Sequence, residues 1–248
     1  IALAQASALR DCTTVAGTDV LQWRRQQLAR GGTAADLDWL LDLAAGLRWA
    51  SLQRLLLDPT RTVALEQSLE VLSELWERHL HGNVPLQHLV GLCPWRDVLL
   101  ESSPAALIPR QETELLVDLA MSQFTTTPPA RWADLGTGSG AIAVALARAW
   151  PTAPGHGVDL SPDALQLAER NLQGCAPHHN CSLHLGSWWS PLKSWWGSLD
   201  LVVSNPPYIP DAVVDGLEAV VRDHEPHLAL LGGADGLDAI RTVVDGAP

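Results

Sequence analysis

Apolar and polar positions in the first third of the chain follow the spacing of amphipathic helices. Thr33 and Asp36 form a predicted capping box, and leucines recur after them at intervals of three and four residues. A longer stripe predicts a helix from about 62 to 81, which the Gly-Asn pair at 82–83 ends. We therefore expect residues 1 to about 82 to be helical.

From residue 131 onward, short apolar strands alternate with helices. We expect strands at 131–135, 155–159, 181–185 and 199–203, and helices at 111–123, 140–149 and 162–173. This alternation predicts an α/β fold built from βαβ units around a parallel sheet, with strand order 3-2-1-4-5. The predicted domains are a helical domain at 1–84, a hairpin linker at 85–110 and a sheet domain at 111–248.

Charge and composition exclude several classes of protein. The 248 residues include 28 acidic and 16 basic side chains, giving a net charge of −12, which disfavours binding to nucleic-acid phosphates. No apolar run approaches the roughly 20 residues that span a bilayer, and no signal peptide is recognisable. The four cysteines are too few for a disulfide scaffold. We expect a cytoplasmic protein without a membrane partner.

A glycine-rich turn follows the first predicted strand. Its small residues let a ligand approach the backbone closely, and the helix behind it offers free N–H groups to an anion. The turn comprises Gly136, Thr137, Gly138, Ser139 and Gly140. The alternate glycines differ from the dinucleotide pattern and suit a ligand with a carboxylate. Asp159 ends the next strand, where an acidic residue binds ribose hydroxyls. Together these features predict S-adenosyl-methionine as the cofactor, against the alternative of a purely structural turn.

A second motif, Asn205-Pro206-Pro207-Tyr208, lies just past the fourth predicted strand. The prolines hold the backbone extended, and Tyr208 offers a flat face to a planar group. The Asn205 side chain and the Pro206 carbonyl are two acceptors that can grip an NH2 group. An amide nitrogen held in this way would direct its lone pair at a methyl donor, and the acceptors would stabilise its developing positive charge.

Topology brings the two motifs together. In the predicted sheet, the first and fourth strands are neighbours at the point where the winding reverses, and ligands bind outside the carboxyl ends of such strands. The glycine turn and Asn205 should therefore face one cleft. This arrangement predicts methyl transfer to a nitrogen of an amide or an aniline-like group.

These residues resemble the HemK/PrmC family of protein-(glutamine-N5) methyltransferases, which act on peptide chain release factors. The resemblance covers nearly the whole chain and rests on segments 85–91, 107–114, 134–143, 204–209, 225–226 and 232–237, together with Asp159. It implies a Rossmann-like methyltransferase sheet behind a small N-terminal helical domain that docks the substrate. It also implies class I release factors as partners, the glutamine of a Gly-Gly-Gln motif as the target, and no direct nucleic-acid partner. We expect a monomer.

The resemblance also assigns roles to residues. It implies that the glycine turn holds the methionine part of the cofactor, that Asp159 holds the ribose, and that Trp188 lies against the adenine. Asn205 would contact both cofactor and substrate. The segment from Asn205 to Tyr208 would bind the substrate glutamine, with Asn205 and Pro206 as the catalytic groups.

The chain departs from the family pattern at three places. Gln111 stands where the family has proline, and Ser187 stands where an acidic residue precedes the aromatic. The terminal strand pair of the family is missing after Pro248, so we expect a truncated sheet domain whose last strand, near 228–231, is an exposed edge.

Three other interpretations stay open. The Asn-Pro-Pro-Tyr motif also occurs in N6-adenine methyltransferases of DNA and RNA, although the acidic charge argues against them. A non-catalytic cofactor-binding remnant would bind the cofactor without turnover. Cysteines and histidines at 175–184 have the residue types of a metal site, but their spacing matches no trusted pattern, so we expect no metal.

Overall fold

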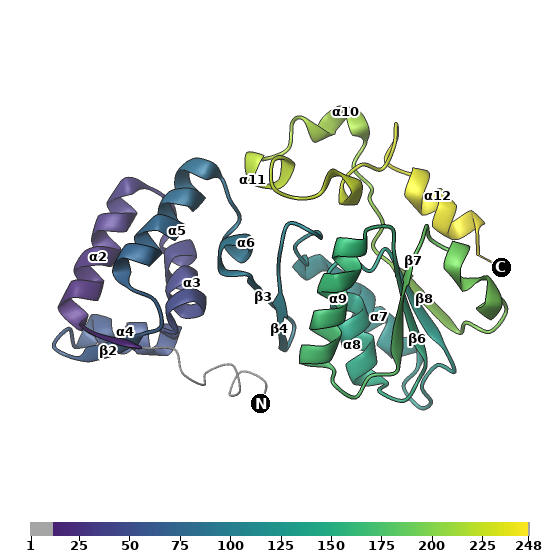
Figure 1. Ribbon diagram of the computed structural model, residues 1–248, viewed down its shortest axis with the longest axis horizontal. Coiled ribbons are helices and arrows are strands. Elements are labelled where there is room, and N and C mark those ends of the chain that lie inside the picture. The colour runs from purple at the N-terminus through teal and green to yellow at the C-terminus, as the bar shows by residue number, and fades with distance from the viewer. Residues whose placement is uncertain (1–11, 248) are drawn as a thin grey trace. The chain divides into compact units, whose positions relative to one another are not determined.

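The computed structural model describes residues 12–247 and divides into two compact units (Figure 1). The first unit ends at Val90 and the second begins at Gly91. Within residues 12–247, no helix is both long and apolar enough to cross a membrane.

The first unit is a small helical bundle with one short ribbon. Its elements are β1 (Thr13–Ala16), α2 (Gly17–Arg30), α3 (Ala34–Ala45), α4 (Trp49–Leu57), β2 (Thr62–Leu65), α5 (Leu69–Gly82) and α6 (Leu86–Val90). The inward faces of these helices bury leucines around Trp76, which is fully enclosed. The predicted cap of α3 is confirmed, because Thr33 Oγ1 accepts a hydrogen bond from Asp36 N at 3.1 Å.

The prediction of a continuous helix from 62 to 81 was wrong. Residues 62–65 instead form β2, which pairs antiparallel with β1, and the helix begins at Leu69 behind a Ser68 cap. Thr62 and Val63 are β-branched and favour strands. Pairing with β1 decided the strand conformation of residues 62–65. The expectation for residues 1–11 lies outside the described residues.

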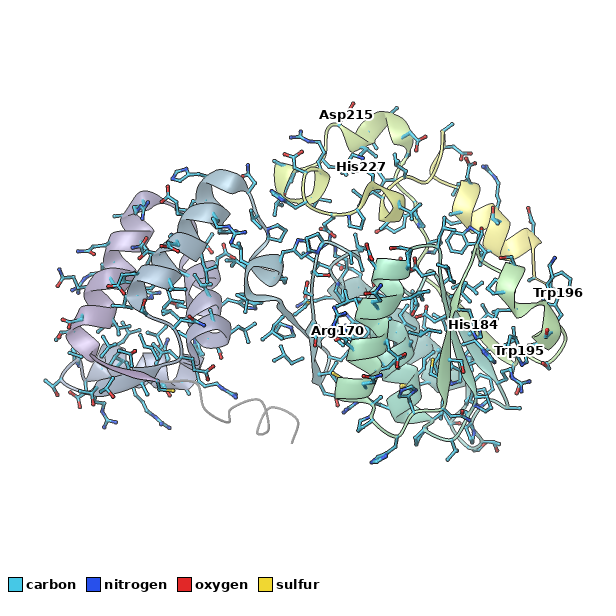
Figure 2. The ribbon with its side chains drawn as sticks, viewed as in Figure 1. Arg170, His184, Trp195, Trp196, Asp215 and His227 are labelled. Carbon is cyan, nitrogen blue, oxygen red and sulfur yellow. The ribbon has the colours of Figure 1, made fainter. Side chains whose placement is uncertain are left out.

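The second unit opens with a hairpin of β3 (Leu92–Trp95) and β4 (Val98–Glu101). Trp95 and Leu100 are buried in the core of this unit, so the hairpin expected as a linker packs with the sheet domain. Asn171 of α9 (Pro162–Cys175) fastens it there. Its Oδ1 accepts from Glu101 N at 2.6 Å, and its Nδ2 donates to Glu101 O at 3.1 Å. Arg170 on the same helix pairs with the Glu101 side chain (Figure 2).

A four-stranded parallel sheet forms the centre of the second unit, in the order β7-β6-β5-β8. Its strands are β5 (Trp132–Leu135), β6 (Gly155–Asp159), β7 (Cys181–Leu185) and β8 (Leu201–Ser204). This order confirms the first four positions of the predicted 3-2-1-4-5 arrangement. Helices α7 (Glu114–Gln123), α8 (Ala141–Ala149) and α9 lie together on one face of the sheet (Figure 1).

The other face of the sheet carries the 3₁₀ helix η2 (Ser190–Trp195) and α12 (Asp238–Asp245). Trp189 Nε1 donates to Val243 O at 2.9 Å and ties these two segments together. His184 and Trp195 meet on this face with ring centroids 5.4 Å apart (Figure 2), and His156 stacks on Trp195 at 4.2 Å. Burial lowers the pKa of His156 to about 4, so this imidazole is neutral near pH 7.

Residues 211–231 form short helices above the sheet. They are α10 (Asp211–Val214), α11 (Ala219–Arg222) and the 3₁₀ helix η3 (His227–Ala229). The prediction of a last strand near 228–231 was therefore wrong. Only Leu231 makes a β contact, an isolated parallel bridge to Ile209. Pro226 is the N-cap residue of η3, and this 3₁₀ turn does not extend the sheet.

Gly140 is a position where the fold requires glycine. Its φ is +79°, and a Cβ there would stand 3.0 Å from the Cα and Cβ of Ala168 in α9. Gly138 also has a positive φ, +55°, but a Cβ there would meet only Ala106, at an ordinary 3.8 Å. The two glycines share a left-handed backbone conformation and differ in packing.

We expect Gly140→Ala to destabilise the chain more than Gly138→Ala. Both substitutions incur left-handed backbone strain of about 1–2 kcal/mol. Gly140→Ala adds an overpacking cost of about 1–3 kcal/mol against α9. Urea unfolding of the two variants measures the difference, and equal midpoints at equal slopes would contradict this packing argument.

Candidate active site at the carboxyl edge of the sheet

Strand register brings the predicted motifs to one edge. In the parallel pairing, Leu135 of β5 stands opposite Val158 of β6 and Ser204 of β8. The residues that come next in each strand are Gly136, Asp159 and Asn205. The two predicted motifs and the acidic residue therefore leave the sheet side by side.

A cavity of about 460 Å³ lies at this edge. It brings together most of the predicted site residues, namely Gly136, Thr137, Gly138, Ser139, Asp159, Trp188, Asn205 and Pro207. Gly140, Pro206 and Tyr208 do not line it. Gly140 instead precedes α8 as its N-cap, and Tyr208 is 59% exposed.

The glycine turn is held to the sheet by its backbone. Gly136 N and Thr137 N both donate to Val158 O, at 2.8 and 2.9 Å. Ala141 and Ile142, the first two residues of α8, line the cavity. The first backbone N–H groups of a helix have no partner inside the helix and favour an anion. The turn thus presents a site suited to a carboxylate.

The Asp159 carboxylate accepts two backbone hydrogen bonds and also lines the cavity. Its Oδ2 accepts from Gly138 N at 2.8 Å and its Oδ1 accepts from Ser161 N at 2.9 Å. The carboxylate therefore shapes the glycine turn and the start of α9. Each carboxylate oxygen can accept a further hydrogen bond, and Asp159 lines the cavity, so it can also receive ligand hydroxyls.

Trp188 stands at the side of the cavity in a strained conformation. Its φ is +48°, which is rare for a bulky residue and is found where surrounding structure imposes it. Its ring lies over Gly136, since a Cβ on Gly136 would be 3.2 Å from Trp188 Cζ3. A flat aromatic surface thus borders the glycine turn.

Asn205 is half-buried, and its side-chain amide is hydrogen-bonded to Thr113. Its Nδ2 donates to Thr113 Oγ1 at 3.3 Å. Ser204 Oγ donates to Leu135 O at 2.7 Å, which ties the end of β8 to the end of β5. Sequence reasoning missed Thr113, although it lies inside one of the segments that carried the family resemblance.

A buried carboxylate supports the segment that precedes Thr113. Glu225 is 5% exposed; its Oε2 accepts from Ile108 N at 3.1 Å and its Oε1 pairs with Arg110 at 2.5 Å. This pair joins the loop at 107–110 to the segment carrying α11 and η3. The sequence marked the Glu-Pro pair only by resemblance, and it contained no sign of the partner.

Asn171 supports the glycine turn from behind. The Nδ2 that binds Glu101 O also donates to Ser139 O at 2.9 Å, and Asn171 is 2% exposed. No sequence pattern singled it out. Within residues 12–247, no three histidine, cysteine or acidic side chains are grouped as a metal site would need.

Asp134 is a buried acid beneath the turn. Burial raises its pKa to about 7, and the nearby Asp159 carboxylate adds to the rise. The Thr137 hydroxyl opposes this rise by donating to Asp134 Oδ2 at 2.6 Å. Asp134 is fully enclosed, so its charged form is poorly solvated.

This raised pKa has a predictable effect on stability. The folded chain holds the Asp134 proton up to about pH 7, whereas the unfolded chain releases it near 3.8. Asp134 therefore disfavours folding increasingly as the pH rises from about 4 to about 7. We expect the free energy of unfolding of Asp134→Asn, relative to the original chain, to improve steadily across that interval. Urea unfolding of both proteins at pH 4.5, 6 and 7.5 measures this; a pH-independent difference would contradict it.

The chain is similar to known methyltransferases. The profile of the methyltransferase small domain family matches residues 111–231. A release factor glutamine methyltransferase from Prochlorococcus marinus is 56% identical over 231 residues, covering 92% of this chain and 79% of that protein. A protein of the same name from Gloeobacter violaceus is 44% identical over 226 residues, covering 90% and 77%.

A third such protein, from Synechocystis, is 37% identical over 246 residues, covering 94% of this chain and 81% of that protein. Among solved structures, a precorrin-6y C5,15-methyltransferase from Geobacter metallireducens is 19% identical, with a TM-score of 0.33. The match covers 40% of this chain and 49% of that chain. At the identity and coverage of the curated relatives, the chain belongs to the release factor glutamine methyltransferase family.

Proposed function

We propose that the chain transfers a methyl group from S-adenosyl-methionine to the side-chain nitrogen of a release-factor glutamine. The observation that carries the proposal is the common edge of the sheet, where the glycine turn, Asp159 and two residues of the Asn-Pro-Pro-Tyr motif, Asn205 and Pro207, line one cavity. Curated relatives that bear the name of this activity support it.

The residues present fit this cofactor. The Gly136 and Gly138 backbones leave room for a ligand beside the N-terminus of α8, which suits the amino-acid carboxylate. Asp159 offers acceptors to ribose hydroxyls, and Trp188 offers its ring to the adenine. Ser187 also lines the cavity but cannot replace a carboxylate as acceptor for the adenine amino group with equal strength. The cofactor supplies an electrophilic methyl group when it is bound.

Asn205 and Pro206 would act on the substrate amide. The Asn205 Oδ1 and the Pro206 carbonyl would accept the two N–H groups of the glutamine side chain and fix the direction of its lone pair. As the nitrogen gains positive charge, these acceptors bind it more strongly than in the ground state. Pro206 does not itself line the cavity, but its two neighbours in the chain, Asn205 and Pro207, do.

The first unit, up to Val90, is our proposed docking surface for the release factor, as the family resemblance implies. A translation factor as substrate would place the reaction in the cytoplasm. We further propose that the chain acts as a monomer, which sedimentation of the purified protein tests directly.

Methyl transfer from labelled S-adenosyl-methionine tests the function. We expect label in a purified class I release factor and none in the same factor with its motif glutamine changed to alanine. Duplex DNA and RNA serve as acceptors for the rival N6-adenine activity. Cofactor binding without transfer to any acceptor would support a non-catalytic protein instead.

Two substitutions should separate catalysis from cofactor binding. Asn205→Ala should lower turnover by roughly 10²–10³, the scale for loss of one preorganised polar contact, with a small change in the cofactor dissociation constant. Asp159→Asn should mainly raise the cofactor dissociation constant, because an amide is a weaker acceptor than a carboxylate for the ribose hydroxyls. Calorimetry and single-turnover assays measure both. Unchanged turnover in Asn205→Ala would remove its proposed role, and an unchanged dissociation constant in Asp159→Asn would do so for Asp159.

A further inference from the structure

The Asn205 side chain has two chemically different ends, and only one of them suits the proposed reaction. Its Oδ1 can accept an N–H from a substrate amide, whereas its Nδ2 can only donate. Rotation of the terminal torsion by half a turn exchanges the two ends within a broad, roughly two-fold energy profile. A neighbouring acceptor that binds Nδ2 would hold the amide with Oδ1 free for a ligand.

Thr113 is placed to bind the Nδ2 end of this amide. Its Oγ1 accepts from Asn205 Nδ2 at 3.3 Å, and both residues line the cavity. Among the side-chain contacts of residues 12–247, this is the hydrogen bond made by the Asn205 amide, and no donor is bound to its Oδ1. With Nδ2 engaged by Thr113, the acceptor oxygen of the amide is left for a ligand.

Thr113 is itself firmly held. It ends the 3₁₀ turn η1 (Gln111–Thr113), and its N donates to Arg110 O at 3.2 Å. The same carbonyl accepts from Trp95 Nε1 at 2.9 Å. The Arg110 guanidinium is bound by the buried Glu225. The turn is thus anchored to the hairpin on one side and to the segment after α11 on the other.

We propose that Thr113 is a positioning residue that holds the Asn205 amide with its oxygen toward the substrate nitrogen. This inference rests on the proposed function and extends it to a residue that does not itself touch the reacting atoms. Any acceptor at this place would serve, so serine should replace threonine and the isosteric valine should not.

Kinetics of Thr113→Val and Thr113→Ser provide the first test. Thr113→Val should lower kcat about three- to tenfold, the range for loss of one neutral hydrogen bond, while the cofactor dissociation constant and Tm stay near those of the original chain. Thr113→Ser should recover most of the lost kcat. Equal kcat in the original chain and Thr113→Val, or equal losses in both variants, would overturn the inference.

A double-mutant cycle makes the test specific to Asn205. In the Asn205→Ala background, Thr113→Val should have no further effect on kcat, since it acts only through the missing amide. If the kcat of the double variant is lowered by the product of the two single losses, Thr113 does not act through Asn205.

A readout that does not depend on activity separates this inference from the proposed function. The side-chain NH2 signals of Asn205, assigned by their loss in Asn205→Ala, should exchange faster with solvent in Thr113→Val and not in Thr113→Ser. If the original chain methylates no release factor but these signals respond as stated, the function fails and the Asn205–Thr113 contact stands. Signals unaffected by Thr113→Val would overturn the inference whatever the activity.

Discussion

The register of β5 between β6 and β8 is the constraint on which the site depends. Leu135 faces Val158 on one side and Ser204 on the other, so that one further residue in each strand supplies Gly136, Asp159 and Asn205. Because side chains alternate along a strand, a shift of one residue in any of these pairings would turn the motif to the wrong face. The apolar residues of β5, enclosed on both faces of the sheet, fix this register.

Buried polar side chains then fasten the loops around the edge. Asn171 binds β4 and the glycine turn, and Glu225 binds the loop at 107–110. Burying such groups is costly unless their hydrogen bonds are satisfied, so each specifies one arrangement of the segments it joins. Asp134, beneath the turn, differs from these residues. Within the described part of the chain it has no cationic partner, and burial raises the pKa of its carboxyl group to about 7. The resulting frame gives the cavity its walls.

Much of this organisation was predictable from local patterns. The helix cap at Thr33, the four strands of the sheet and the glycine turn were recognised because each depends on a few neighbouring residues. The errors arose where distant partners decide the conformation. Residues 62–65 took a strand because β1 pairs with them, and 228–231 took a 3₁₀ turn and a single bridge instead of a strand. Periodicity carries no information about such partners.

The amino-acid sequence by itself determined the parallel α/β class, the motifs at the strand ends and the chemistry that those motifs can support. These follow from short-range periodicity, from the backbone freedom of glycine and from the rigidity of paired prolines. Only the tertiary structure decided that Thr113 meets Asn205 across 92 positions, that Trp188 lies over Gly136, and that Glu225 anchors Arg110. Such contacts depend on how buried polar groups satisfy one another after the sheet has closed, because their partners lie far apart in the chain.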